Sequence, residues 1–238
     1  MQISRRALLG GSATLTMAGL APLNAWASDP EKPQPTPAQA LQRLRLGNGS
    51  FSNEKLVPYP IDKKFRESLA GGQSPYATIV CCSDSRAGPE QIFQKGLGEL
   101  FVVRNAGNTI GAYTSMGSIE YSVATFRVPL IVVLGHSECG AVDAASAMVG
   151  GPVHLGGSMQ AMVEPILPAA IAARGDRHAA VFENVRQVAA RLRSREQPIL
   201  FPPQQTGKLK VVGAVYDLKS GVVDFFDIPP GIGSPAHH

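Results

Sequence analysis

Short apolar runs alternate with longer stretches of helical length along the chain. Three runs are rich in β-branched residues or leucine, at 77–80, 100–103 and 130–134. Continuous apolar runs of this length predict strands that are covered on both faces, as in a parallel sheet. Residues 114–126, between the second and third runs, have the length of a helix. The pattern predicts strands and helices in alternation around one parallel sheet.

The C-terminal part of the chain carries one amphipathic helix and one hairpin. Four apolar residues recur there at helical spacing: Val181, Val185, Val188 and Leu192. Two further apolar runs, 209–216 and 222–226, are joined across a Lys-Ser-Gly segment, which predicts an antiparallel hairpin. This hairpin is expected to supply an antiparallel edge to the sheet.

A helix is also expected at the start of the folded part. Thr36 is a good N-cap residue, and Pro37 suits the first helical position. Leu41 and Leu44 give this helix one apolar face, and the glycines at 47–49 are expected to end it.

The segment before this helix has the layout of an export signal. Residues 1–27 contain Arg5 and Arg6, a mildly apolar stretch and an Ala-Trp-Ala cleavage site. The paired arginines resemble a twin-arginine signal. The alternatives are an ordinary secretory signal and a cytoplasmic protein with a fortuitous start. We expect a periplasmic or otherwise exported protein.

The remaining chain reads as one α/β domain without internal repeats. We expect a mainly parallel β-sheet with an antiparallel edge, flanked by helices, over residues 36–230. A Pro-rich and charged tether is expected at 28–35 and a short tail at 231–238.

Composition narrows the class of protein further. The chain has 238 residues, a formal net charge of +4, 44% hydrophobic residues and 17% charged residues. This charge is too small and too scattered for a nucleic-acid-binding protein, and the apolar content argues against disorder. Three cysteines do not make a disulfide framework. Beyond the N-terminal segment, no apolar run has the length of a membrane-spanning helix.

Reactive side chains gather at the ends of two expected strands. The first strand runs into C-C-S-D-S-R at 81–86, and the third runs into G-H-S-E-C-G at 135–140. Ligands bind beyond the carboxyl ends of strands in an open parallel sheet, so these two loops are expected to meet. Together they offer two thiolates and one imidazole, donors that suit Zn²⁺.

Three protein ligands leave a fourth position open, which is typical of a catalytic zinc site. Zinc in such a site lowers the pKa of a bound water from ~15.7 to ~7. Each motif alone has a simpler interpretation, such as a buried cysteine or a charged turn closed by an Asp84–Arg86 pair. The combination at two strand ends favours the metal site.

Six motifs, in order and spacing, resemble the β-class carbonic anhydrases. They are C-S-D-S-R at 82–86, F-V-V-R-N-A-G-N at 101–108, S-I-E-Y at 118–121, G-H-S-E-C-G-A-V at 135–142, E-N-V at 183–185 and V-Y-D at 215–217. The resemblance implies that Cys82, His136 and Cys139 bind one zinc ion per chain. It also implies an Asp84–Arg86 dyad in which the arginine holds the aspartate away from the metal.

The resemblance extends to a substrate pocket. Gln73 matches a glutamine that donates a hydrogen bond to substrate, Phe101 and Tyr121 match the pocket wall, and Gly140 offers a backbone N–H. Ile79 stands where the bicarbonate-inhibited subgroup has tryptophan, which favours the plant-type, always-open subgroup.

Three positions depart from the family pattern or stand beside it. Ala87 and Ala106 replace bulkier residues, which widens the expected pocket. Cys81 is expected to point away from Cys82, buried and without a metal. A vicinal disulfide between the two cysteines is the alternative.

The implied activity is reversible hydration of CO2 to bicarbonate and a proton. The alternatives are a COS or CS2 hydrolase on the same fold, and a non-catalytic zinc-binding scaffold, against which the Asp84–Arg86 dyad argues. The implied assembly is a homodimer or a dimer of dimers, with the 36–47 helix embracing the partner. His154 and His178 are candidate proton carriers only because histidine titrates near neutrality.

Overall fold

Five strands form one mixed sheet in the order β2-β1-β3-β4-β5. The structure is a computed structural model that describes residues 33–111 and 113–232, so the signal expected at residues 1–27 lies outside the described residues. The strands are β1 (Ala77–Cys81), β2 (Leu100–Arg104), β3 (Leu130–His136), β4 (Lys210–Tyr216) and β5 (Val223–Asp227). The first four are mutually parallel and β5 is antiparallel to β4. The expected sheet with an antiparallel edge is confirmed.

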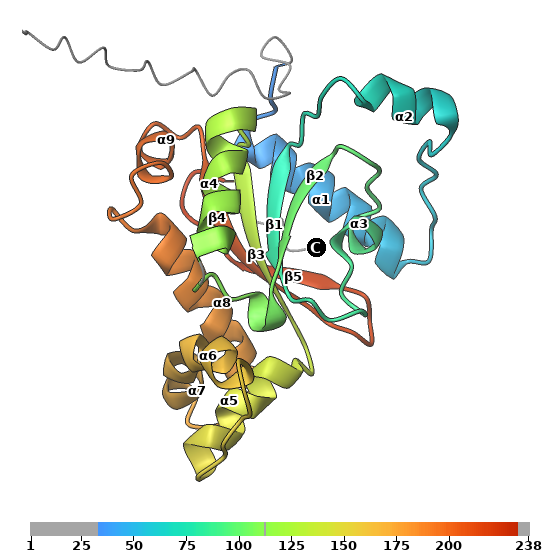
Figure 1. Cartoon of the computed structure of the whole chain (residues 1–238). Coiled ribbons are helices and arrows are strands. Elements are labelled where there is room, and N and C mark those ends of the chain that lie inside the picture. Colours follow the sequence, from blue (N-terminus) through green and yellow to red (C-terminus); the bar gives the residue numbers. More distant parts are fainter. Residues whose placement is uncertain (1–32, 112, 233–238) are drawn as a thin grey trace, which may run out of the picture.

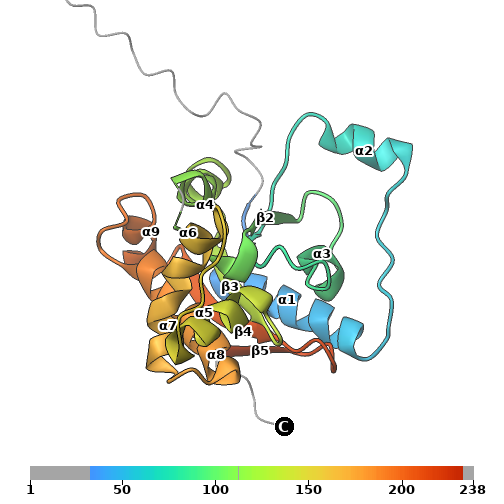
Figure 2. The same cartoon turned by 60° about the horizontal axis from the view of Figure 1, so that its bottom comes forward.

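Helices cover both faces of this sheet (Figure 1, Figure 2). The helices are α1 (Pro37–Ser52), α2 (Lys63–Leu69), α3 (Pro89–Ile92), η2 (Ala106–Asn108), α4 (Tyr113–Phe126), α5 (Gly140–Gly150), α6 (Met159–Val163), η3 (Glu164–Ile166), α7 (Leu167–Ala172), α8 (Arg177–Arg193) and α9 (Phe201–Gln205). Apolar residues of α4, α5, α7 and α8 pack on one face in what we call the first core. Those of α1 and α3 pack on the other face in the second core.

The strands divide their side chains between these cores with a period of two. In β1, Val80 joins the first core, whereas Ile79 and Cys81 join the second. Successive residues of a strand point to opposite faces, and both faces here are covered, so the strand reads as an unbroken apolar run. The next residue, Cys82, lies on the side of the first core.

Helix α1 does not end at the glycines of 47–49, as expected, but continues to Ser52. A Cβ at Gly47 would lie 1.8 Å from the carbonyl oxygen of Phe93, so this glycine permits close packing and does not end the helix. The buried Asn48 then bonds to the hairpin: its Nδ2 donates to Gly221 O (2.8 Å), and its Oδ1 accepts from Val223 N (2.8 Å).

Strand β2 was expected to be fully buried, and this was wrong. It forms the edge of the sheet, and only Val103 of its five residues is buried.

Beyond α1, the segment leading to α2 stands away from the sheet (Figure 1, Figure 2), and no residue of α2 is buried. Leu56 and Ile61 in this segment are 87% and 63% exposed. Helices α2, α3 and α9 were not predicted.

The ends of the described chain are attached to the domain. Gln34 Nε2, within the expected tether, donates to Ser74 Oγ (3.2 Å) and to Phe126 O (3.1 Å). Ile232, within the expected tail, is buried in the second core. In the part of the chain that the structure describes, no helix combines the length and apolar character needed to cross a membrane.

Candidate metal centre

The two reactive loops meet at the carboxyl edge of the sheet, as expected. Cys82 follows β1, His136 is the last residue of the neighbouring β3, and Cys139 is the N-cap of α5. Their sulfur and ring-nitrogen atoms all lie within 4.8 Å of one another. Among residues 33–111 and 113–232, this is the group of three such side chains that is arranged to hold a metal ion.

His136 presents a nitrogen that needs a partner. The side chain is 1% exposed, and its Nδ1 lies 2.8 Å from the carbonyl oxygen of Ser137. Donation from Nδ1 to that carbonyl leaves a free lone pair on Nε2. Nε2 is buried without a hydrogen-bond partner in the described structure. An unsatisfied buried acceptor beside two thiols fits a metal ligand.

The thiols of Cys82 and Cys139 are close enough to form a hydrogen bond with each other. The Cys139 S–H donates to the Cys82 sulfur at 4.0 Å, which lowers the pKa of Cys82 to about 4. The backbone N–H groups of Asp84 (3.4 Å) and Gly107 (3.3 Å) also donate to this sulfur. The same hydrogen bond and burial raise the pKa of Cys139. A divalent cation between the two sulfur atoms would displace their protons, and two thiolates and one imidazole make a donor set that fits zinc.

A carboxylate stands beside this cluster, held by an arginine. Arg86 donates from Nε to Asp84 Oδ1 (3.0 Å) and from Nη2 to Oδ2 (2.7 Å). The backbone N–H of Arg86 adds a bond of 2.8 Å to Oδ1. The hydrogen bonds from Arg86 hold the pKa of Asp84 well below its usual range. Asp84 Oδ2 lies 3.9 Å from His136 Nε2, so an ionised acceptor flanks the free nitrogen.

Cys81 lies apart from the cluster. It is buried in the second core, on the other face from Cys82, and it is a free cysteine. Burial raises the pKa of its thiol to about 12, which disfavours the thiolate that binds metals. The expected position of Cys81 is confirmed.

The expected pocket residues divide into two groups. Gly140 is exposed and begins α5 directly after Cys139. Phe101 pairs with Thr78, so about 13 Å of strand separates it from the level of Cys82. The Tyr121 ring lies 6.3 Å from the Phe101 ring. These two rings therefore lie away from the metal cluster within one chain.

Gln73 and the two histidines also lie outside the cluster. Gln73 is exposed and precedes β1. His154 is exposed. His178 lines a cavity of about 590 Å³ together with Ser137 and Glu138, which stand between two of the clustered residues. The roles of all these side chains stay predictions.

Sequence reasoning missed an arginine that supports the first loop. Arg104, the last residue of β2, donates from Nε to Cys82 O (2.9 Å) and from Nη2 to Asp84 O (2.6 Å). It therefore fixes the backbone on which Cys82 and Asp84 are carried. The F-V-V-R-N-A-G-N motif contains this residue, but nothing local in it shows which carbonyls the arginine holds.

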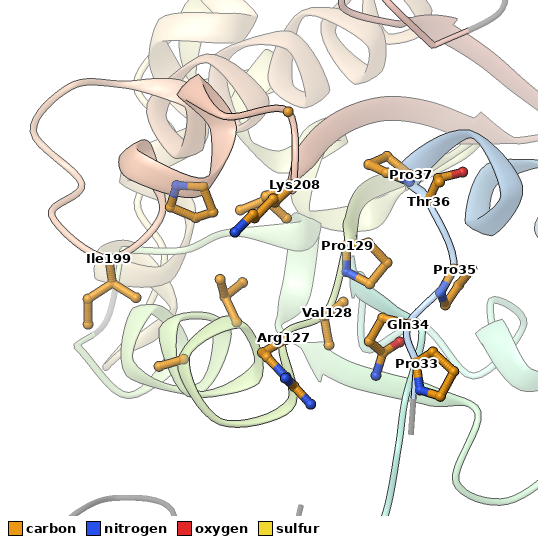
Figure 3. A pocket seen from close by; sticks show the side chains of 15 residues that line it. Pro33, Gln34, Pro35, Thr36, Pro37, Arg127, Val128, Pro129, Ile199 and Lys208 are labelled. Atoms are coloured by element: carbon orange, nitrogen blue, oxygen red, sulfur yellow. The ribbon is translucent and has the colours of Figure 1, made fainter. Parts of the chain in front are cut away.

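A second cavity lies far from this chemistry. Figure 3 shows a pocket of about 630 Å³ lined by Pro33, Pro35, Pro129 and Lys208, among others. Pro129 directly precedes β3, so the pocket sits at the opposite end of the strand from His136.

Comparison with known proteins identifies close similarity over most of the chain. The carbonic anhydrase family profile matches residues 77–223. Carbonic anhydrase 2 of Mycobacterium tuberculosis is 39% identical over 193 residues, which are 79% of this chain and 92% of that protein. A carbonic anhydrase of Pseudomonas aeruginosa is 39% identical over 71% of this chain and 81% of its own. The solved Coccomyxa β-carbonic anhydrase in complex with acetazolamide has a TM-score of 0.60 at 27% identity, covering 69% of this chain and 78% of that one.

Proposed function

The chain belongs to the β-carbonic anhydrase family, and on this premise we propose that Cys82, His136 and Cys139 bind the zinc ion of the enzyme, one per chain. The enzyme interconverts carbon dioxide and water with bicarbonate and a proton. The observation that supports the zinc site is the buried, unpartnered Nε2 of His136 beside two thiols, with all three ligand atoms within 4.8 Å. When bound, zinc supplies a nucleophile at neutral pH by lowering the pKa of water.

The residues around the metal orient the reaction. Asp84 is ionised and lies beside His136 Nε2, so it can accept a hydrogen bond from the reacting water and fix its direction. Arg86 keeps the carboxylate aimed through two hydrogen bonds. Gly140 is exposed and begins α5, where the helix dipole is positive, so its backbone N–H can donate to an oxygen of the product.

The substrate is tested by two assays on the same zinc-replete protein. CO2 hydration should be fast, inhibited by acetazolamide, and lost together with zinc. Turnover of COS or CS2 that exceeds CO2 hydration would make the chain a hydrolase on this fold. Zinc bound without turnover of any of these would make it a scaffold.

We expect the active assembly to be a homodimer or a dimer of dimers. The support comes from apolar side chains on the surface of one chain: Leu46, Leu56 and Ile61 are 63%, 87% and 63% exposed. The edge strand β2 adds a half-buried Phe101. Solvent-exposed apolar surface of this kind marks protein interfaces. Sedimentation equilibrium measures the assembly, and a monomer at micromolar concentration would contradict the proposal.

The proposed location is the periplasm or another exported compartment. The support is the sequence of residues 1–27, with its paired arginines and Ala-Trp-Ala site.

A further inference from the structure

The loop after β2 places a hydrogen-bond donor on a metal-site sulfur. The N–H of Gly107 donates to Cys82 Sγ at 3.3 Å. Gly107 is buried and has φ 66° and ψ 26°, a left-handed conformation that glycine adopts readily. A Cβ here would lie 2.5 Å from Cδ1 of Ile166. The direction of this N–H is set by the backbone conformation at Gly107, so it depends on the contacts that fix the loop.

A buried amide from a distant helix holds this loop. Asn184 lies in α8 on the face that carries Val181 and Val185 into the first core, and it is 2% exposed. A polar side chain on such a face requires a hydrogen-bond partner. Its Nδ2 donates to the carbonyl oxygen of Gly107 at 2.9 Å, across 77 residues of sequence. One residue thus receives a bond from Asn184 and gives a bond to Cys82.

We propose that Asn184 is a positioning residue for the metal centre, which acts on Cys82 through Gly107. An N–H donor to a thiolate stabilises its negative charge and fixes the direction of the sulfur. By holding the Gly107 carbonyl, Asn184 keeps the adjacent N–H on the sulfur. The inference rests on the proposed zinc site.

The loop after β2 is also held by hydrogen bonds of Asn105, so loss of the Asn184 bond can be distinguished from general loss of the loop structure. Asn105 Nδ2 donates to Thr109 O (3.1 Å) and to Ser115 Oγ (3.0 Å), and its backbone N–H donates to Cys81 O (3.1 Å). These bonds do not involve α8. Removal of the Asn184 amide should therefore loosen the Gly107 N–H while the loop stays in place.

The test uses protein in which cobalt(II) replaces zinc. A thiolate that loses a hydrogen bond holds its lone pairs less tightly, so Asn184→Ala should shift the thiolate-to-cobalt charge-transfer band to longer wavelength. The dissociation constant for zinc, measured by competition with a chelator, should rise about 10- to 100-fold. Asn184→Leu is close in size, but its side chain cannot donate to the carbonyl, so it should show the same shift even if the alanine variant fails to fold.

The matched control is Ala189→Gly. This residue is buried in the same helix, and glycine weakens the helix without touching the loop. It should leave the band and the zinc affinity unchanged. Wild-type bands and affinities in both Asn184 variants, or equal changes in the control, would overturn the role of Asn184. If the wild-type protein itself shows no thiolate-to-cobalt band, the proposed zinc site fails instead.

Discussion

Asp84 and Arg86 face each other through two side-chain hydrogen bonds of 3.0 and 2.7 Å, although the arginine side chain is 55% exposed. An ion pair with this exposure is screened by water and contributes little to folding stability. The bidentate geometry of the ion pair instead determines the orientation of the carboxylate. The pair is therefore best understood through the reaction, in which the carboxylate and the guanidinium have different roles.

Asp84→Asn should keep the fold and the zinc, because the three proposed ligands are untouched. The amide is the same size but is a weaker acceptor and can donate where the carboxylate only accepts. CO2 hydration should fall by roughly 10²- to 10⁴-fold, as for loss of a positioned acid–base group. Stopped-flow hydration and zinc analysis on the same sample measure both properties. Near-wild-type activity would reduce the pair to a structural salt bridge.

Arg86→Ala should behave differently, because the freed Asp84 can turn onto the fourth metal position. The variant should be inactive yet bind zinc at least as well, with a closed four-ligand shell visible by X-ray absorption. An open shell would contradict this account.

The pH dependence of this pair has a definite sign. The folded-state pKa of Asp84 is depressed, so the pair's contribution to stability is present above the unfolded value of ~3.9 and is lost as the pH falls below it. Arg86→Ala removes the donors that lower this pKa. In zinc-free protein, where Asp84 has no metal to bind, a carboxyl NMR titration should then show protonation of Asp84 at higher pH in the variant than in the wild type. Equal titration curves would show that the arginine does not act on the carboxylate.

Cys139→Ala should remove zinc and activity together, since a site with two protein ligands holds zinc poorly. Cys81→Ala is the control, because Cys81 is a free cysteine in the other core. It should retain one zinc per chain by elemental analysis. An active enzyme without metal would refute the proposed site.

Asn48→Ala should lower the free energy of unfolding by about 1–3 kcal/mol, because it leaves buried hairpin groups without a partner. Asn53→Ala, at the exposed end of the same helix, should have a smaller effect. Urea denaturation compares the two variants. Equal decreases in the free energy of unfolding for the two variants would mean that the hydrogen bonds from Asn48 to Gly221 and Val223 stabilise the fold no more than Asn53 does at the end of the helix.

Export is tested on the full precursor. Replacement of Arg5 and Arg6 by lysines should leave uncleaved protein in the cytoplasm, whereas the wild type should appear outside with Ser28 as its first residue. Normal export of the lysine form would exclude the twin-arginine route. The exported protein should also lack tryptophan fluorescence, because Trp26 is the only tryptophan and cleavage before Ser28 removes it.

The sequence predicted what local pattern determines. Leu130 and its neighbours could be assigned to a buried strand because every residue of β3 is buried, so the run is continuous. The metal cluster could be predicted because β1 and β3 are adjacent and parallel, so the loops after these two strands meet at one edge of the sheet. The end of α1 was predicted wrongly at the glycines of 47–49 because the reason for Gly47 is not local. This glycine makes room for the backbone of Phe93, which lies far along the chain. Arg104 and Asn184 were missed because their partners are also distant, and nothing beside them marks the bonds they make.

The bond between Asn48 and Val223 spans 175 residues and joins the first helix to the last strand. During synthesis from the N-terminus, Asn48 leaves the ribosome early, but its hydrogen bond with Val223 cannot form until β5 has also left the ribosome. Among the described strands, β5 likewise pairs only with β4, which itself comes late in the chain. The contacts between the end of α1 and the hairpin therefore form only after translation is nearly complete. A ribosome-bound nascent chain that stops before residue 221 should therefore hold the end of α1 near Asn48 less firmly than the released full chain does, as measured by hydrogen exchange.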